Sequence, residues 1–182
     1  MNRIPSVTEV LSPWSDFSKV RPDVLEAAAE RGSMVHRACG AIAKGVWAPP
    51  VPEEYAGYVQ SFSIWLRMAV EDVILVEPEL VHPVYGYCGH PDLIVRIKGD
   101  EGFTLPDLKT PVATSPTWPP QLAGYKELAE ANGYPIQRIL SVRLRKSGTM
   151  PVIDEYTGSL NSALAVFLSC LTAWKYFKGD QR

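Results

Sequence analysis

Cysteine is scarce in this chain of 182 residues, and the three that occur are Cys39, Cys88 and Cys170. Their wide spacing and the lack of any CxxC pair predict neither a disulfide framework nor a thiolate metal site. An iron–sulfur cluster would need four ligating cysteines, so we expect none. This cysteine usage fits a reducing cytoplasm.

Long apolar runs are missing as well. Residues 1–10 contain no apolar stretch of signal-peptide length, which argues against secretion. Residues 160–177 are the one candidate membrane span, but five polar residues interrupt them: Asn161, Ser162, Ser169, Thr172 and Lys175. This length and polarity predict a largely buried core helix and no membrane association.

The chain also lacks an excess of positive charge, because 18 Lys and Arg against 20 Asp and Glu give a formal net charge of -2. Charge alone does not announce nucleic-acid binding, although carboxylates gathered around a metal ion can mask a basic face in the total. What the chain does have is 46% hydrophobic residues, enough for one sizeable core. We expect a single domain over residues 1–182.

Capping signals and hydrophobic periodicity predict helices over residues 6–13, 22–44, 53–70, 121–132 and 160–177, and strands over 73–85, 92–98, 102–109 and 136–146. The first three strands are expected to pair as an antiparallel meander. The helix residues expected to face the core are Val24, Ala28, Val35, Ala38, Tyr55, Tyr58, Phe62, Trp65 and Met68. An aromatic stripe at helical spacing favours packing over a base-stacking platform.

The segment with the most chemical information is Gly89-His-Pro-Asp92, followed by Asp107-Leu-Lys109. Side chains at i and i+2 of a strand project to the same face, so Asp107 and Lys109 lie side by side while Leu108 points into the core. If the two strands pair through the turn at 99–102, Asp92 approaches Asp107. Clustered carboxylates repel unless a cation lies between them, and oxygen ligands suit Mg²⁺ or Mn²⁺.

The alternative is an ordinary salt bridge between Asp107 and Lys109, with Asp92 capping a turn. For an isolated DxK tripeptide that alternative would be preferred. Here the flanking apolar residues indicate a buried strand, where a charged pair is costly and calls for a reason.

Four ordered segments resemble the PD-(D/E)XK nucleases, in particular the branch of RecB-type nuclease domains, phage exonucleases and the mitochondrial genome maintenance exonuclease. Gly32-Ser-Met-Val-His36 resembles the GxxxH helix motif of that branch, and Gly89-His-Pro-Asp92 resembles its GxxD strand. Asp107-Leu-Lys109 resembles the (D/E)xK signature, and Gln121-Leu-Ala-Gly-Tyr125 resembles the QxxxY helix motif. Each motif is weak alone, whereas the ordered set is specific.

The resemblance implies an α/β (α+β) fold with a restriction-endonuclease-like core, in which helices flank a central mixed sheet. It also implies one or two Mg²⁺ or Mn²⁺ ions and hydrolysis of DNA phosphodiester bonds. The metal ligands would be His36, Asp92, Asp107 and the backbone carbonyl of Leu108. Lys109 would orient or activate the attacking water, while Gln121 and Tyr125 would position the lysine, the metal shell or the DNA backbone.

Some of these residues have plainer alternatives. A lone helical histidine such as His36 is more often a packing or capping residue, and Gln121 and Tyr125 could be a solvated and a core side chain. Their i, i+4 spacing nevertheless puts the last two on one helix face. Glu77 and Glu79 lie on the strand before Asp92, and of these two acids we expect Glu79 to be a further metal ligand.

Candidate DNA contacts are less visible. Arg143 and Arg145 share a strand face and are expected to contact phosphates, although a solvated edge strand is equally consistent. Trp118, on the loop before Gln121, would either stack on a base or pin that loop.

These features together predict a Mg²⁺- or Mn²⁺-dependent deoxyribonuclease acting on single- or double-stranded DNA, and by resemblance an exonuclease of DNA processing, recombination or repair. The expected setting is the cytoplasm of a bacterial or phage-infected cell, with a second copy of the chain or a recombination protein as partner. The alternative is a catalytically silent nucleic-acid-binding or assembly module of the same fold. The intact Asp92, Asp107 and Lys109 count against it.

Overall fold

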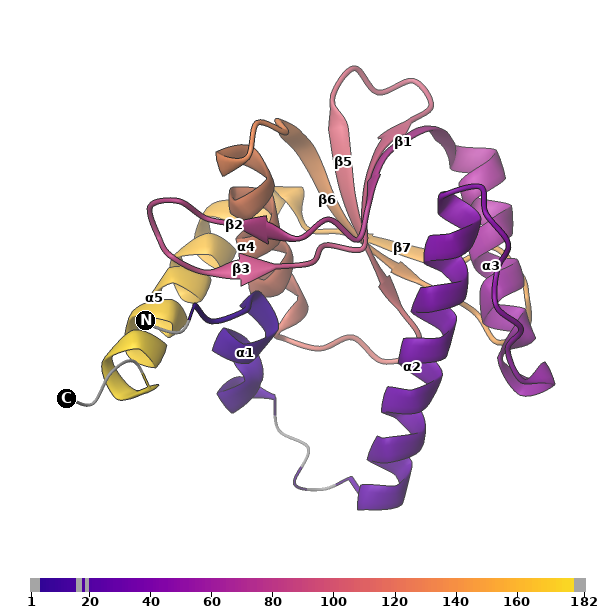
Figure 1. Ribbon diagram of the computed structural model, residues 1–182, viewed down its shortest axis with the longest axis horizontal. Helices are drawn as coiled ribbons and strands as arrows, with labels where there is room; N and C mark the ends of the chain where they lie inside the picture. The colour runs from indigo at the N-terminus through magenta and orange to yellow at the C-terminus, as the bar shows by residue number, and fades with distance from the viewer. Residues whose placement is uncertain (1–3, 16–17, 19, 179–182) are drawn as a thin grey trace.

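The structure, a computed structural model, describes residues 4–15, 18 and 20–178. Its centre is a five-stranded sheet with the strand order β1-β4-β5-β6-β7 (Figure 1). The strands are β1 (Val70–Val76), β4 (Leu93–Ile97), β5 (Phe103–Lys109), β6 (Ile136–Arg143) and β7 (Val152–Glu155). A separate two-stranded sheet is formed by β2 (Leu80–Val81) and β3 (Cys88–Gly89).

The central sheet is mixed, because β5 and β6 run parallel whereas its other neighbouring strands pair antiparallel. A parallel pair needs a crossover connection, and α4 (Trp118–Ala131) supplies it. The register of the parallel pair sets Asp107 opposite Ser141 and Lys109 opposite Arg143. The predicted fold class, a central mixed sheet flanked by helices, is confirmed.

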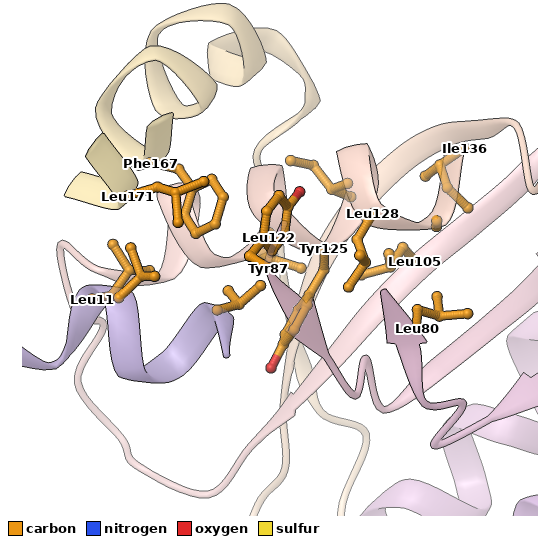
Figure 2. Packing of buried hydrophobic residues seen from close by; sticks show 14 of the residues in the cluster. Leu11, Leu80, Tyr87, Leu105, Leu122, Tyr125, Leu128, Ile136, Phe167 and Leu171 are labelled. Carbon is orange, nitrogen blue, oxygen red and sulfur yellow. The ribbon is translucent and has the colours of Figure 1, made fainter. Parts of the chain in front are cut away.

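Helices cover both faces of this sheet (Figure 1). One face carries α1 (Val7–Leu11), α4 and α5 (Leu160–Lys178), and the other carries α2 (Pro22–Ala43) and α3 (Glu53–Ala69). Because strand side chains alternate, Leu105 of β5 packs with the first set of helices and Leu108 with the second. Figure 2 shows the first cluster, in which the hydroxyl of Tyr125 points away from Phe167 and Leu171 of α5.

The helix boundaries follow local capping chemistry. Ser6 Oγ accepts a hydrogen bond from the N–H of Glu9 at 3.1 Å, as the capping-box pattern predicts, and α1 passes into a 3-10 turn over Ser12–Trp14. The fourth helix begins at Trp118 rather than Gln121, because prolines are tolerated in a first turn whose N–H groups have no helical partner. A second 3-10 turn, Thr157–Ser159, precedes α5.

The predicted single strand over residues 73–85 is wrong. Glu77 has a φ of 48°, a left-handed backbone that is uncommon outside glycine, and a proline follows it. The chain therefore leaves β1 at Val76 and resumes as β2 in the other sheet. Two further differences are that β6 ends at Arg143 rather than residue 146, and that β7 was not predicted.

Two of the predicted core residues are at the surface, with Val24 50% and Met68 62% exposed. The first half of α2 extends past the sheet (Figure 1), so Val24 has little to pack against, whereas Val35 further along is fully buried as predicted. The predicted core residues Ala38, Tyr58, Phe62 and Trp65 are buried, and Ala28 and Tyr55 are half-buried. Within residues 4–15, 18 and 20–178, no helix has the length and apolar character needed to cross a membrane.

Candidate active site

Asp92 lies just before β4 and uses both carboxylate oxygens to join three elements. Its Oδ1 is hydrogen-bonded to Nδ1 of His36 on α2 at 3.0 Å, and its Oδ2 accepts from the backbone N–H of Leu108 on β5 at 2.7 Å. The backbone carbonyl of Asp92 accepts from the N–H of Glu77 at 2.9 Å. Asp92 and His36, which were selected from separate sequence motifs, are thus in direct contact.

Lys109, at the end of β5, is held by three groups. Its ammonium contacts Oδ2 of Asp107 on the same strand, donates to Oε1 of Gln121 on α4 at 3.0 Å, and lies 5.4 Å from the ring centroid of Trp118. The i, i+2 spacing on the strand accounts for the first contact. The lysine is 14% exposed, so these neighbours restrict both its position and its access to water.

Tyr125 lies one helical turn beyond Gln121 and is 5% exposed. Burial raises the pKa of its phenol, and the negative charge of Asp107 raises it further, partly offset by a hydrogen bond from Gln121. Tyr125 therefore stays protonated at neutral pH and keeps a hydroxyl proton to donate.

The two carboxylates have opposite electrostatic settings. Burial alone would raise the pKa of Asp92, but the charge and hydrogen bond of His36 and the N–H of Leu108 outweigh it, so that pKa is lowered. For Asp107 burial dominates and the nearby charge of Asp92 adds to it, so the pKa is raised despite Lys109. Burial would lower the pKa of His36, yet Asp92 raises it. Neighbouring carboxylates whose pKa values are shifted in opposite directions are typical of sites that hold or transfer protons and cations.

The donor set suits a hard divalent cation in its chemistry. Two carboxylates and one imidazole are ligands that Mg²⁺ and Mn²⁺ accept, and Oδ2 of the buried Asp107 is paired with the ammonium of Lys109. A cation there would relieve the repulsion between Asp92 and Asp107. Within the described part of the chain, however, no three His, Cys, Asp or Glu side chains already surround one point as ligands. The hydrogen bond that His36 makes with Asp92 occupies groups that the resemblance assigns to the metal.

Of the two acids before Asp92, Glu77 is the one near His36. It lines a hollow of about 570 Å³ together with His36, Gly32, Ser33 and Arg37. Glu79, the acid we expected there, is exposed, and its negative charge contributes to the raised pKa of the Cys88 thiol, after burial of that thiol. The left-handed backbone at Glu77, which an alternating strand pattern does not signal, ends β1 just before this acid, so strand alternation no longer relates the directions of the two acids.

The predicted DNA contacts separate into three cases. Arg143 donates to Asp154 and to the carbonyl of Val112, so its guanidinium is already engaged. Arg145 is exposed and lines a second hollow. Trp118 is 6% exposed, which leaves little ring surface for a base and favours the alternative that it pins the loop.

Sequence reasoning did not select Ser141 and Asp154, which lie on the same face as Asp107. Ser141 Oγ donates to Asp154 at 3.2 Å, and both stand beside the candidate site in the register of the sheet. The β-branched pair Val152-Ile153 after the turn at residues 147–149 is the signal that could have indicated this strand.

No protein-family model matches this chain, and no curated protein matches it. Solved structures similar to this chain include two of the alkaline exonuclease LHK-Exo from Laribacter hongkongensis. The first has a TM-score of 0.42 and 14% identity over 96% of this chain and 91% of the other. The second, a complex with dAMP, has a TM-score of 0.41 and 15% identity over the same shares. At these values the structural similarity does not determine the activity, so the proposed function rests on the geometry of the site.

Proposed function

We propose that this chain is a divalent-metal-dependent nuclease of the PD-(D/E)XK type that hydrolyses phosphodiester bonds in DNA. The observation that carries the proposal is the grouping of Asp92, Asp107 and Lys109 at one end of the sheet. A buried acid pair with a lysine held beside it is costly to fold, and phosphodiester hydrolysis is a chemistry that uses all three groups. His36 and Gln121 support it, because each bonds directly to one of the three.

A bound Mg²⁺ or Mn²⁺ would supply Lewis-acid stabilisation of the phosphoryl oxygens. Asp92, Asp107, His36 and the carbonyl of Leu108 are the groups proposed to hold it. The ammonium of Lys109 would orient the attacking water, and Gln121 would keep the ammonium in place through its 3.0 Å hydrogen bond. Tyr125, protonated at neutral pH, would donate to a phosphate oxygen.

Within this class we propose an exonuclease that acts in DNA processing, recombination or repair. The order of the four motifs supports that choice, because it resembles the RecB-type and phage branch. Digestion of end-labelled DNA would measure both the preference for single or double strands and the direction of digestion.

The test is digestion of end-labelled linear DNA, both single- and double-stranded, beside circular DNA, in EDTA, Mg²⁺ or Mn²⁺. We expect cleavage of linear DNA with metal, none in EDTA, and survival of circles. Asp107→Ala and Lys109→Ala should each lower the rate by about 100-fold or more, the size of effect typical of a group that moves or orients a reacting proton. Asp72→Ala and Lys98→Ala, exposed residues near the opposite end of the sheet, are the matched controls.

A second readout does not depend on turnover. Mn²⁺ that binds only the folded state should stabilise the wild type by about 2.7 kcal/mol at 100 times Kd and so raise its thermal unfolding midpoint. The midpoint of Asp107→Ala should not rise. DNA binding without cleavage under any metal condition would instead identify the silent binding module. Cleavage retained by both Asp107→Ala and Lys109→Ala would overturn the site assignment.

A further inference from the structure

A second hollow lies directly beyond the end of β5. It has a volume of about 330 Å³ and lies between the turn that joins β6 to β7 and the loop after Lys109. Its main lining residues are Tyr58, Pro111, Val112, Leu144, Arg145 and Lys146. The N–H of Leu144 donates to the carbonyl of Lys109 at 2.8 Å, so this hollow adjoins the candidate site.

Arg145 and Lys146 are exposed, and within the described residues neither side chain has an ion pair or a hydrogen bond. Other arginines of the sheet differ, since Arg96, Arg138 and Arg143 are each paired with an acid. Two adjacent free cations at the rim of a hollow are a setting for an anion.

The turn that carries these two cations is held rigidly against α3. A Cβ added at Gly57 would lie 1.8 Å from the backbone carbonyl oxygen of Lys146, so only glycine allows the two backbones to approach this closely. The backbone N–H of Arg145 donates to the buried Ser61 Oγ at 3.1 Å. On the opposite wall, Arg143 donates to the carbonyl of Val112 at 2.5 Å. The hollow therefore has fixed walls on both sides before any ligand binds.

We propose that this hollow is a subsite for one nucleotide of the DNA strand being cut, next to the phosphate that lies at Lys109. Arg145 and Lys146 bind its backbone phosphate, and the apolar walls at Pro111 and Val112 contact its sugar and base. The volume falls within the range of small-ligand pockets, about 300–1,000 Å³. The chain from Lys109 to Pro111 spans at most about 7 Å. Successive nucleotides of one strand are about 3.4 Å apart along the helix axis, so a nucleotide one or two steps from the phosphate at Lys109 reaches the hollow. This subsite rests on the proposed nuclease function.

The test compares Arg145→Ala/Lys146→Ala with Arg67→Ala/Lys178→Ala, which removes the same charge from exposed positions outside the hollow. Binding of fluorescein-labelled single-stranded and duplex DNA is measured by anisotropy in EDTA over a series of salt concentrations. We expect the first variant to bind about tenfold more weakly, with a salt slope smaller by about one. The control variant should match the wild type, and Arg145→Lys/Lys146→Arg should largely restore binding.

Cleavage kinetics then separate the two claims. If the wild type cleaves DNA, the first variant should show a raised KM with kcat within about twofold, since binding and not chemistry is lost. Equal affinity and equal salt slope in wild type and first variant would overturn the subsite while leaving the nuclease proposal standing. A wild type that never cleaves, but binds DNA through Arg145 and Lys146, would overturn the nuclease proposal and leave the hollow as a site of DNA binding alone.

Discussion

Two arginines from one stretch of sequence have different environments. Arg143 is the last residue of β6, 19% exposed, and its guanidinium bridges Asp154 and the carbonyl of Val112. Arg145 follows two residues later, after the strand has ended, and its side chain makes no ion pair with any residue that the structure describes. Equal spacing and charge gave both the same predicted role, but strand pairing with β7 decides which one has a carboxylate neighbour.

We therefore expect Arg143→Ala to lower the free energy of unfolding by about 1–2 kcal/mol, because a half-buried carboxylate loses charged hydrogen bonds that solvent can only partly replace. Arg145→Ala should change it by less than about 0.5 kcal/mol, as is usual for an exposed side chain. Urea denaturation followed by circular dichroism measures both. Equal stability losses in the two variants would show that the Arg143 bridge contributes nothing special.

The third helix, α3, offers a test at the scale of secondary structure, because Gly57 is the point where it touches the β6–β7 turn. Gly57→Ala puts a methyl group against a backbone oxygen that cannot rotate away. We expect a loss of about 1–3 kcal/mol, the usual cost of overpacking, together with weaker DNA binding because the turn is displaced.

Gly32→Ala is the matched control for Gly57→Ala. Gly32 is also a glycine inside a helix, yet a Cβ added there meets nothing within 4 Å. Replacing it should raise stability by about 0.5–1 kcal/mol, since alanine favours the helix. Thermal melting of both variants gives the comparison; a Gly57→Ala variant as stable as the wild type would mean that the helix and turn are not clamped.

Helices were easier to predict from this sequence than strands, for a physical reason. Helix signals are local: the cap at Ser6 and the periodicity through Tyr58, Phe62 and Trp65 need no distant partner to be interpreted. The strand pattern over residues 73–85 instead concealed a left-handed residue at Glu77, and β7 is only four residues long, with two β-branched residues as its signal. Strand boundaries depend on which neighbour pairs, and sequence alone does not state that.

The candidate site was predicted to a similar extent. Strand alternation places Asp107 and Lys109 together, and helical spacing puts Gln121 and Tyr125 on one helix face, but the position of that face beside the lysine required the resemblance. The contact between His36 and Asp92 required the resemblance, since they lie on separate elements 56 residues apart. The facing of Glu77 and the engagement of Arg143 were missed because both depend on backbone conformation and pairing established only in the folded sheet.

At the scale of the whole molecule, the described residues form two apolar clusters, one on each face of the central sheet. Neighbouring residues of the same strand belong to different clusters: Ile94 packs with α1, α4 and α5, whereas Val95 packs with α2 and α3, and both are fully buried. Loss of packing in one cluster would disturb the strands against which the other cluster packs. The two faces should therefore unfold together, as one cooperative domain.

Natural thiols report on the two faces separately. Cys39 is fully buried in the α2 and α3 cluster, where burial raises the pKa of its thiol, and Cys170 is 8% exposed in the other cluster. We expect pulsed alkylation at increasing urea, resolved by peptide mass, to give the same midpoint for both cysteines, with Cys88, which is half-buried, labelled earlier. Labelling of Cys170 at clearly lower urea than Cys39 would mean that the α4 and α5 layer opens as a unit of its own. The strands β4 and β5 contribute side chains to both clusters. A common midpoint therefore also requires the end of the sheet that holds Asp92 and Asp107 to stay folded until both clusters unfold.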